Sequence, residues 1–336
     1  FGFQLFWDLI LSICAAIVLQ GMAGRIGIIG RKSIIGVIRE EIELPWARNF
    51  VLILIFGAIM IGNTAYEAGN ISGAALGLET LIGSFSFESS VLNLKLYPIL
   101  IGLIAATLLW IGKYKILERS LIFLVVIMSL SFLVTAVATR PSLAQIFSGL
   151  FRFSTPESGL LSIIGLVGTT IVPYNLFLHT ELVREKWSSK ADLPFAIKDM
   201  LIALTLGGLI SMSIIITAAG VEATTINNAA DLALGLAPIF GEGAKYLLSI
   251  GLFAAGITSS ITAPLAAAYV VCGCFGWSTD LTSRSFRRSW AIVILFGMLL
   301  ASTGLKFILI IQFAQIANGI LLPMIAAILL WIMNKA

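Results

Sequence analysis

Residues 165–179 read GLVGTTIVPYNLFLH, an apolar run with a proline near its middle. Pro173 has no N–H to donate to the carbonyl of Thr169, and its ring pushes against that same carbonyl. Gly168 lies just before it and tolerates a distorted backbone. The stretch therefore predicts a helix that kinks or unwinds at Pro173 and leaves backbone carbonyls without intrahelical partners.

The composition of the chain indicates that this helix lies in a membrane. Of the 336 residues, 59% are hydrophobic and only 11% are charged, with a mean hydropathy of +1.05. A soluble domain carries roughly 25% charged residues. So few charges cannot cover a surface that faces water, and lipid is the expected solvent. No basic stripe with interleaved aromatic residues occurs, so nucleic acid is not an expected partner.

Apolar runs along the chain predict the number of membrane spans. A bilayer core about 30 Å thick requires about 20 apolar residues in each spanning helix. Nine runs qualify, near residues 3–29, 49–82, 96–112, 116–138, 157–187, 196–220, 240–275, 289–303 and 305–333. The runs 49–82 and 240–275 are too long for perpendicular spans, which predicts tilt or extension beyond the bilayer. Residues 226–237 are expected to form a short surface helix in a loop.

The distribution of Lys and Arg predicts the orientation. Sixteen of the 21 basic residues follow the first, third, fifth, seventh or last run, and five lie on the other side. Basic loops stay in the cytoplasm, so the C-terminus is expected inside and Phe1 outside. One further helix upstream of Phe1 is expected, which would make ten. We expect an integral protein of a bacterial inner membrane, with residues 1–336 forming a single transmembrane domain.

Polar side chains inside the apolar runs mark the candidate site, because such groups are costly in a membrane. Around Pro173 these side chains are Thr169, Thr170, Tyr174, Asn175 and His179. The run 49–82 contains Asn63, Thr64, Glu67 and Asn70, and the run 305–333 contains Gln312, Gln315 and Asn318. Asn63, Glu67 and Asn70 share one helix face. A plain proline kink and a structurally paired Glu67 remain alternatives. Neither a phosphate-binding loop nor a nucleophile with its base occurs, so an enzyme is not expected.

Residues 168–179 resemble the pattern G-A-x-x-M-P-H-N-L-Y-L-H of the sixth helix in the natural-resistance-associated macrophage protein (NRAMP) family of divalent-metal transporters. Residues 3–7, 20–27, 64–67 and 255–262 are similar to further family segments, so the resemblance covers nearly the whole chain. It implies an all-α, leucine-transporter-type fold of two inverted five-helix repeats. Family helices two to ten would be visible here, and the first, with its metal-binding D-P-G-N turn, would be absent.

The resemblance also implies a function and its partners. The chain would be a single transmembrane transporter domain that moves divalent cations by secondary-active transport. The divalent cation would be a substrate, with no permanently bound cofactor, and the lipid bilayer, the cation and protons would be the partners.

Individual positions take roles from the same resemblance. The freed carbonyl of Thr169 would occupy the place of a backbone metal ligand. Val172 stands where the family has a methionine ligand. Tyr174 stands in place of the first family histidine, and His179 matches the second. Gln315 matches a glutamine that approaches the ion.

Proton coupling and selectivity are where this chain departs from the family. Glu67 matches the acid of a D-x-x-E proton path, but Thr64 replaces its aspartate, and Arg288 matches a basic residue near that path. A thioether is a soft ligand that favours Mn²⁺ and Fe²⁺ over Mg²⁺, whereas Val172 offers no lone pair. We therefore expect relaxed selectivity, or a shift toward Mg²⁺. The alternative is the same fold moving a non-metal or monovalent solute without metal binding.

Overall fold

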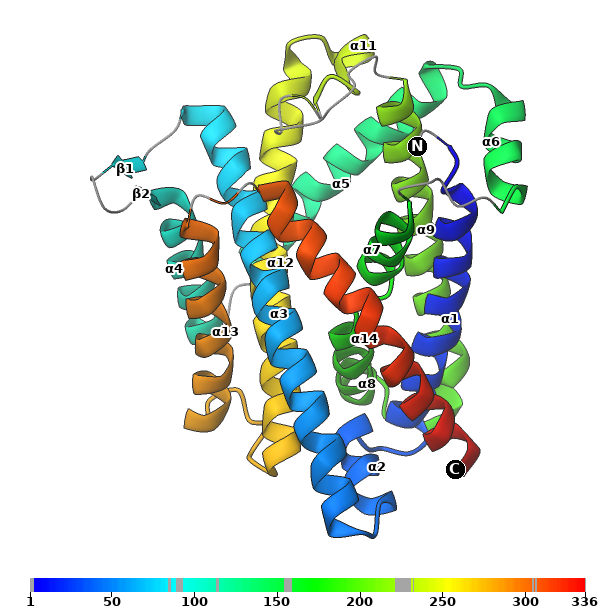
Figure 1. Cartoon of the computed structure of the whole chain (residues 1–336), viewed down its shortest axis with the longest axis vertical. Coiled ribbons are helices and arrows are strands. Elements are labelled where there is room, and N and C mark those ends of the chain that lie inside the picture. Colours follow the sequence, from blue (N-terminus) through cyan, green and yellow to red (C-terminus); the bar gives the residue numbers. More distant parts are fainter. Residues whose placement is uncertain are drawn as a thin grey trace.

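A computed structural model describes residues 3–83, 86–88, 93–112, 115–153, 159–220, 231, 233–303, 305 and 307–335. Within these ranges the chain is almost entirely helical (Figure 1). The long helices are α1 (Phe6–Ile28), α3 (Pro45–Ile82), α4 (Leu96–Ile111), α5 (Lys115–Ala138), α7 (Leu160–Thr170), α8 (Pro173–Lys186), α9 (Leu193–Ala219), α12 (Gly243–Phe275), α13 (Arg284–Ser302) and α14 (Phe307–Lys335). The shorter elements are α2 (Ile34–Glu41), α6 (Leu143–Phe151), α11 (Ala237–Phe240), the 3₁₀ turn η1 (Lys190–Asp192) and the antiparallel strands β1 (Ser86–Glu88) and β2 (Asn93–Lys95).

The expected spans agree with these helices. Among the described residues, eight helical stretches are long and apolar enough to cross a bilayer, with α7 and α8 together forming one of them. The ninth expected span, 96–112, is the 16-residue helix α4, which is shorter than a full perpendicular span. The expected surface helix at 226–237 falls largely on residues 221–230 and 232, which lie outside the described residues.

Helix boundaries differ from the expected ones where a cap lies outside the apolar run. Pro45 occupies the first turn of α3, where its missing N–H costs nothing, so the helix starts before residue 49. The hydroxyl of Ser283 accepts a hydrogen bond of 3.3 Å from the backbone N–H of Phe286, which starts α13 ahead of residue 289. Capping chemistry, and not hydropathy, sets these ends.

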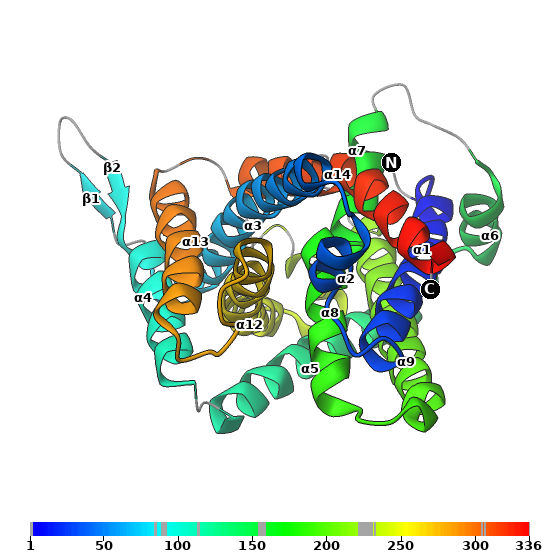
Figure 2. The same cartoon turned by 90° about the horizontal axis from the view of Figure 1, so that it is seen from below.

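The helices α3 and α12 form the centre of one half of the molecule. With 38 and 33 residues they are about 57 and 50 Å long, more than the bilayer core requires. They pack closely because small residues meet: a methyl group added at Gly256 would lie 2.6 Å from Cβ of Ala74. Viewed from below, α12 lies among α3, α4, α5, α8 and α13 (Figure 2).

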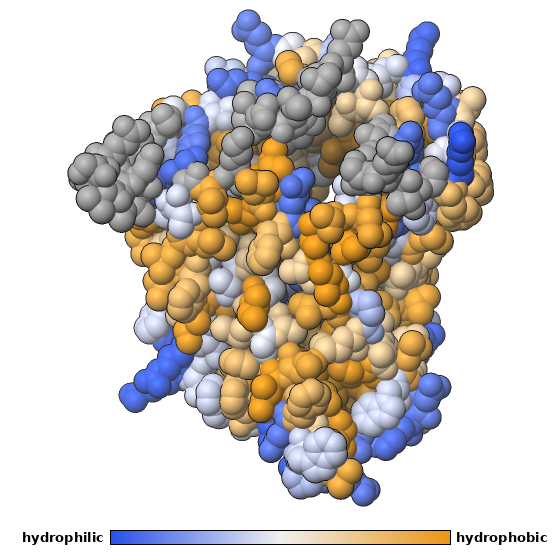
Figure 3. All heavy atoms as spheres, in the orientation of Figure 1, coloured by the Kyte–Doolittle hydropathy of each residue, from blue (hydrophilic) through white to orange (hydrophobic). Residues whose placement is uncertain are grey.

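The outer surface of the bundle suits lipid. Large apolar side chains are exposed along the helices, among them Phe123, Leu130, Leu206, Phe296 and Phe313. The face drawn in Figure 3 has a broad hydrophobic middle, with hydrophilic residues gathered toward its two ends. This pattern fits an integral membrane protein whose helices run between two aqueous surfaces.

Candidate functional site

The predicted interruption of the helix lies between α7 and α8. Thr170 is the last residue of α7 and Pro173 is the first of α8. Ile171 (φ −118°, ψ 78°) and Val172 (φ −75°, ψ 121°) between them are not helical. The stretch 157–187 is therefore two helices placed end to end (Figure 1).

The interruption frees backbone acceptors. The N–H of Ile171 donates to the carbonyl of Val167 at 2.8 Å, and the next bond, from Asn175 to the carbonyl of Val172, spans 3.0 Å. Within the described residues, no backbone N–H donates to the carbonyls between these two acceptors, from Gly168 to Ile171. Free carbonyls at membrane depth are tolerated where they are buried in protein or line a cavity.

Thr169 is the point at which three helices meet. The side-chain amide of Gln315 on α14 donates a hydrogen bond of 3.2 Å to the hydroxyl oxygen of Thr169. The side chain of Tyr66 on α3 also lies near the Thr169 side chain. The rings of Tyr66 and Tyr174 pack edge to face with centroids 5.7 Å apart, which brings the first turn of α8 to the same place.

Glycines allow this approach of α7 to α14. A methyl group added at Gly168 would overlap the backbone carbonyl of Gln315 and the backbone nitrogen of Gly319. One added at Gly319 would overlap the carbonyl of Ile164. The two helix backbones are therefore in direct contact beside the break, which fixes the position of the Gln315 side chain.

A cavity of about 580 Å³ reaches the break from one side. Its lining residues come from the start of α1, from one face of α7, from α9 and from α14: Leu5, Leu161, Ser162, Gly165, Leu166, Thr169, Ile215, Gln312, Gln315 and Ile316. Thr169 and Gln315 lie in both the hydrogen-bonded cluster and the cavity wall. A solute in the cavity can therefore contact a hydroxyl and a side-chain amide next to the open carbonyls.

The predicted metal-site residues come together around the break, and their donors are neutral. Val172 and Tyr174 are buried, with 4% of each side chain exposed, whereas Thr169 and Gln315 are half-buried. Hydroxyl, amide and carbonyl oxygens are hard ligands that suit cations such as Mg²⁺ and Mn²⁺. No group of three or more His, Cys, Asp or Glu residues that could hold a metal ion occurs in the part of the chain that the structure describes.

Glu67 forms a separate buried site next to this cluster, one residue along α3 from Tyr66. Its side chain is fully buried, Asn70 donates to one carboxylate oxygen at 3.4 Å, and the other oxygen has no partner among the described residues. Ser260 on α12 lies close by, and a methyl group at Gly297 on α13 would be 2.6 Å from Cγ of Glu67. The carboxyl group therefore sits between three helices.

Of the other predicted proton-path residues, the structure places Thr64 near Glu67 but not His179 or Arg288. Thr64 is half-buried on α3, three residues and about one turn before Glu67. His179 lies on α8 against α1, where a methyl group at Gly24 would be 3.4 Å from its Nε2 atom. Arg288 is exposed near the start of α13, and nine residues, or about 13 Å of helix, separate it from Gly297.

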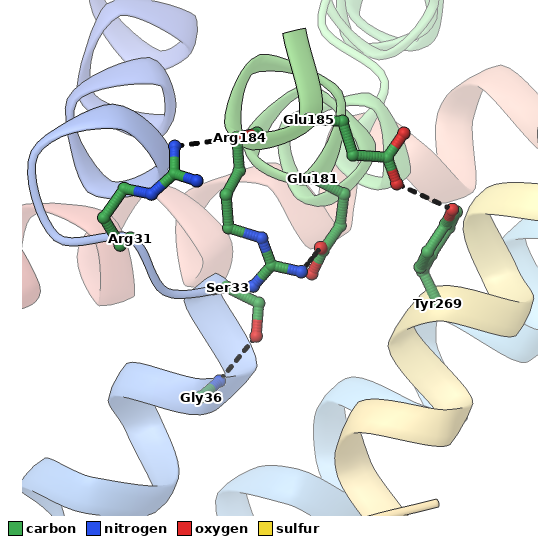
Figure 4. A network of polar contacts seen from close by, with 7 residues as sticks. All are labelled: Arg31, Ser33, Gly36, Glu181, Arg184, Glu185 and Tyr269. Atoms are coloured by element: carbon green, nitrogen blue, oxygen red, sulfur yellow. Dashed lines mark hydrogen bonds and ion pairs between the residues drawn. The ribbon is translucent and has the colours of Figure 1, made fainter. Parts of the chain in front are cut away.

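A polar network at the far end of α8 was missed by the sequence reasoning (Figure 4). Arg31 donates to the carbonyls of Arg184 and Trp187 at 3.1 and 2.7 Å, which caps the C-terminus of α8. Arg184 pairs with the buried Glu181 at 2.5 Å, and the hydroxyl of Tyr269 on α12 lies 3.4 Å from Glu185. The three-residue spacing of Glu181 and Arg184 was the available signal for part of this network.

Comparison with known proteins gives a consistent result. The sequence model of a family described as "Natural resistance-associated macrophage protein-like" matches residues 1–336. A divalent metal cation transporter MntH from Deinococcus radiodurans is 27% identical over 313 residues, which cover 89% of this chain and 69% of that protein. MntH from Bacillus subtilis is 26% identical over 317 residues, which cover 91% of this chain and 71% of that protein.

A solved structure also resembles this chain. The crystal structure of a mutant manganese transporter from Eremococcus coleocola superposes with a TM-score of 0.74 at 18% identity, covering 98% of this chain and 72% of that one. At this identity the likeness shows the fold. The expected all-α membrane fold of the leucine-transporter type is therefore confirmed.

Proposed function

The chain belongs to the natural resistance-associated macrophage protein-like family, and on that premise we propose that it carries divalent metal cations across a membrane. Its relatives are named as divalent metal cation transporters, and its structural neighbour is a manganese transporter. The family is one of transporters and not of enzymes. The cation is therefore a substrate that passes through the site.

The interruption between α7 and α8 is the observation that carries this proposal. It leaves carbonyls of Gly168 to Ile171 without backbone donors, next to the hydroxyl of Thr169 and the amide of Gln315. A cavity opens onto Thr169 and Gln315. Transporters build cation sites at the membrane midplane from such discontinuous helices. In our proposal, the cation binds at the carbonyl of Thr169, with Gln315 beside it and Val172 and Tyr174 next to the break.

The ligand chemistry favours hard cations. Val172 is buried at the break and offers no lone pair, so no thioether favours Mn²⁺ or Fe²⁺. The remaining donors are oxygens, and Mg²⁺ usually keeps several of its waters when it binds protein oxygens. We therefore propose a selectivity that is relaxed among divalent cations or shifted toward Mg²⁺.

Secondary-active coupling is assigned to Glu67. Its carboxyl group is fully buried one residue from Tyr66, whose side chain lies near Thr169. A lone buried carboxylate is costly unless it is neutralised, so it can exchange a proton as the cation moves. Thr64, one turn before Glu67 on α3, is proposed to act beside it in the proton path. His179 and Arg288 are proposed to act at a distance, in gating or in proton entry, because they lie outside the cluster at the break.

The neutral character of the break supports a second candidate. A site without an acidic ligand can also hold a monovalent or uncharged solute against the hydroxyls and the aromatic rings of Tyr66 and Tyr174. The same fold would then move a non-metal solute without binding metal.

The proposed setting is the inner membrane of a bacterium with the C-terminus in the cytoplasm. The excess of Lys and Arg on one side of the spans supports this orientation. Named relatives from bacteria, among them those from Deinococcus radiodurans and Bacillus subtilis, support the bacterial origin.

Liposomes that contain the full-length protein test the two candidates. Uptake of Mn²⁺ and of Mg²⁺ is measured separately, each with the other cation and with Ca²⁺ as competitors. Saturable uptake of at least one of them, with Mg²⁺ competing against Mn²⁺, is expected. Uptake of neither cation would overturn the metal proposal and leave the second candidate.

A further inference from the structure

A buried carboxyl group on α1 has no part in the site described above. Asp8 and Ser12 lie one turn apart on the same face of α1, and each is 3% exposed. The Oδ2 atom of Asp8 and the hydroxyl of Ser12 both have no hydrogen-bond partner among the described residues. Two unpartnered polar side chains on one buried helix face require a physical reason.

The position of Asp8 in the first turn of α1 explains only part of the burial of these two side chains without partners. Negative charge near a helix N-terminus interacts favourably with the helix dipole. The dipole interaction does not account for the buried hydroxyl of Ser12 one turn further on. It also does not give the Oδ2 atom of Asp8 a hydrogen-bond partner. A helix-end carboxylate alone would be equally well served by an exposed position.

Among the described residues, no opposite charge is paired with Asp8. The elements packed against α1 are α2, α6, α7, α8, α9 and α14. The charged residues of α2, Arg39, Glu40 and Glu41, follow the C-terminal end of α1, opposite to Asp8 in its first turn. The described residues of α6, α7, the second half of α9 (206–219) and the first half of α14 (307–320) carry no titratable or charged side chain. Arg152 follows α6 and is exposed. His179 on α8 faces Gly24, 16 residues or about 24 Å along α1 from Asp8.

The number of oxygen ligands that Asp8 and Ser12 supply favours a proton over a metal cation as the bound species. Mg²⁺ and Ca²⁺ require about six oxygen ligands, whereas Asp8 and Ser12 supply one carboxylate and one hydroxyl, each on a residue that is 3% exposed. A proton needs one carboxylate oxygen. The neutral acid can donate its O–H to the Ser12 hydroxyl oxygen, and the ionised form can accept the Ser12 O–H, since side chains four residues apart on a helix are within reach.

We propose that Asp8 and Ser12 form a proton-binding site at the N-terminal end of α1. A proton from water adds to an Asp8 carboxylate oxygen, and its release returns the same proton to water. Leu5, one turn before Asp8, lines the cavity that reaches Thr169 and Gln315. The site therefore lies close to the wall of that cavity, and it deepens the proposed function, on which it rests, by coupling cation entry to external pH.

Infrared difference spectroscopy of the full-length protein tests proton binding without transport. Spectra are recorded across a pH titration for the wild type, Asp8→Asn, Ser12→Ala and the matched control Asp280→Asn, which changes an aspartate in an exposed loop. The proposal expects the C=O band of a buried carboxylic acid in the wild type and the control. It expects loss of that band in Asp8→Asn and a changed frequency in Ser12→Ala.

Liposome uptake of Mn²⁺ at a series of external pH values supplies the functional arm. A flatter pH dependence in Asp8→Asn, with the control unchanged, is the expected result. Identical spectra and identical pH profiles for the wild type and Asp8→Asn would overturn the proposal. A change in the Mn²⁺ concentration for half-maximal uptake without any change in pH dependence would assign a metal instead. Absence of uptake by the wild type would count against the proposed function only, because the spectra still decide the role of Asp8.

Discussion

The side-chain nitrogen of Gln315 lies 3.2 Å from the hydroxyl oxygen of Thr169, which joins α14 to the last turn of α7 beside the break. Both residues line the cavity. The proposed cation site, the packing of α7 on α14 and the interruption between α7 and α8 are therefore connected through one hydrogen bond. The predictions below change its members or their neighbours one at a time.

Replacement of Gln315 by alanine removes the amide from the cavity wall and the hydrogen bond to Thr169. A net hydrogen bond contributes about 1 kcal/mol, so the cation concentration for half-maximal uptake should rise about fivefold to tenfold. Gln312→Ala is the matched control, because Gln312 also lines the cavity but makes no hydrogen bond to Thr169. Equal effects of the two substitutions on Mn²⁺ uptake would contradict a specific role for Gln315.

Replacement of Gly168 by alanine should destabilise the protein. The added methyl group would overlap the backbone of Gln315 and Gly319, so α7 and α14 would have to separate. Overpacking of this kind costs about 1–3 kcal/mol, measured as a lower midpoint of thermal unfolding in detergent. Gly207→Ala on α9 is the control, since nothing lies within 4 Å of its added methyl group. It should be neutral or slightly stabilising.

Replacement of Val172 by methionine adds a soft thioether at the break. If the cation binds beside the carbonyl of Thr169, the affinity for Mn²⁺ should rise relative to Mg²⁺. Competition uptake and binding titrations measure the ratio. Val167→Met, one turn before the break on α7, controls for the added volume. An unchanged Mn²⁺ titration would argue that no metal binds near Thr169.

Replacement of Glu67 by glutamine removes a buried proton acceptor while keeping its shape. Proton movement that accompanies cation uptake should fall strongly, whereas cation binding at the break should remain. A pH-sensitive dye inside the liposomes measures the proton movement. Glu79→Gln is the control, because Glu79 lies on the same helix and pairs with Lys95 at 3.5 Å near the surface. Proton movement that survives Glu67→Gln would exclude Glu67 as the coupling group.

Much of the fold could be predicted from local features of the sequence. Pro173 predicted the interruption because the missing N–H acts on its own helix and requires no knowledge of neighbours. The spans followed from apolar length. The start of α3 at Pro45 and of α13 at Arg284 did not, because caps extend helices beyond the apolar runs.

Tertiary contacts set the limit of what the sequence could predict about the site. The Gln315–Thr169 bond and the Tyr66–Tyr174 contact join residues on different helices, and no spacing along the chain encodes them. The capping of α8 by Arg31 was not predicted for the same reason. Asp8 is different, because an acid inside the apolar run 3–29 can be seen in the sequence, whereas its burial without a partner cannot. Arg288 had been placed near the proton path by resemblance alone, and its exposed position follows from where α13 begins.

The most direct measurement of the central claim is an experimental structure of the full-length protein with Mn²⁺, with the metal located by its anomalous scattering. An anomalous peak is expected beside the carbonyl of Thr169, with one helix ending at Thr170, a second beginning at Pro173, and Gln315 facing the ion. A continuous helix through Pro173, or a metal bound away from Thr169, would contradict it.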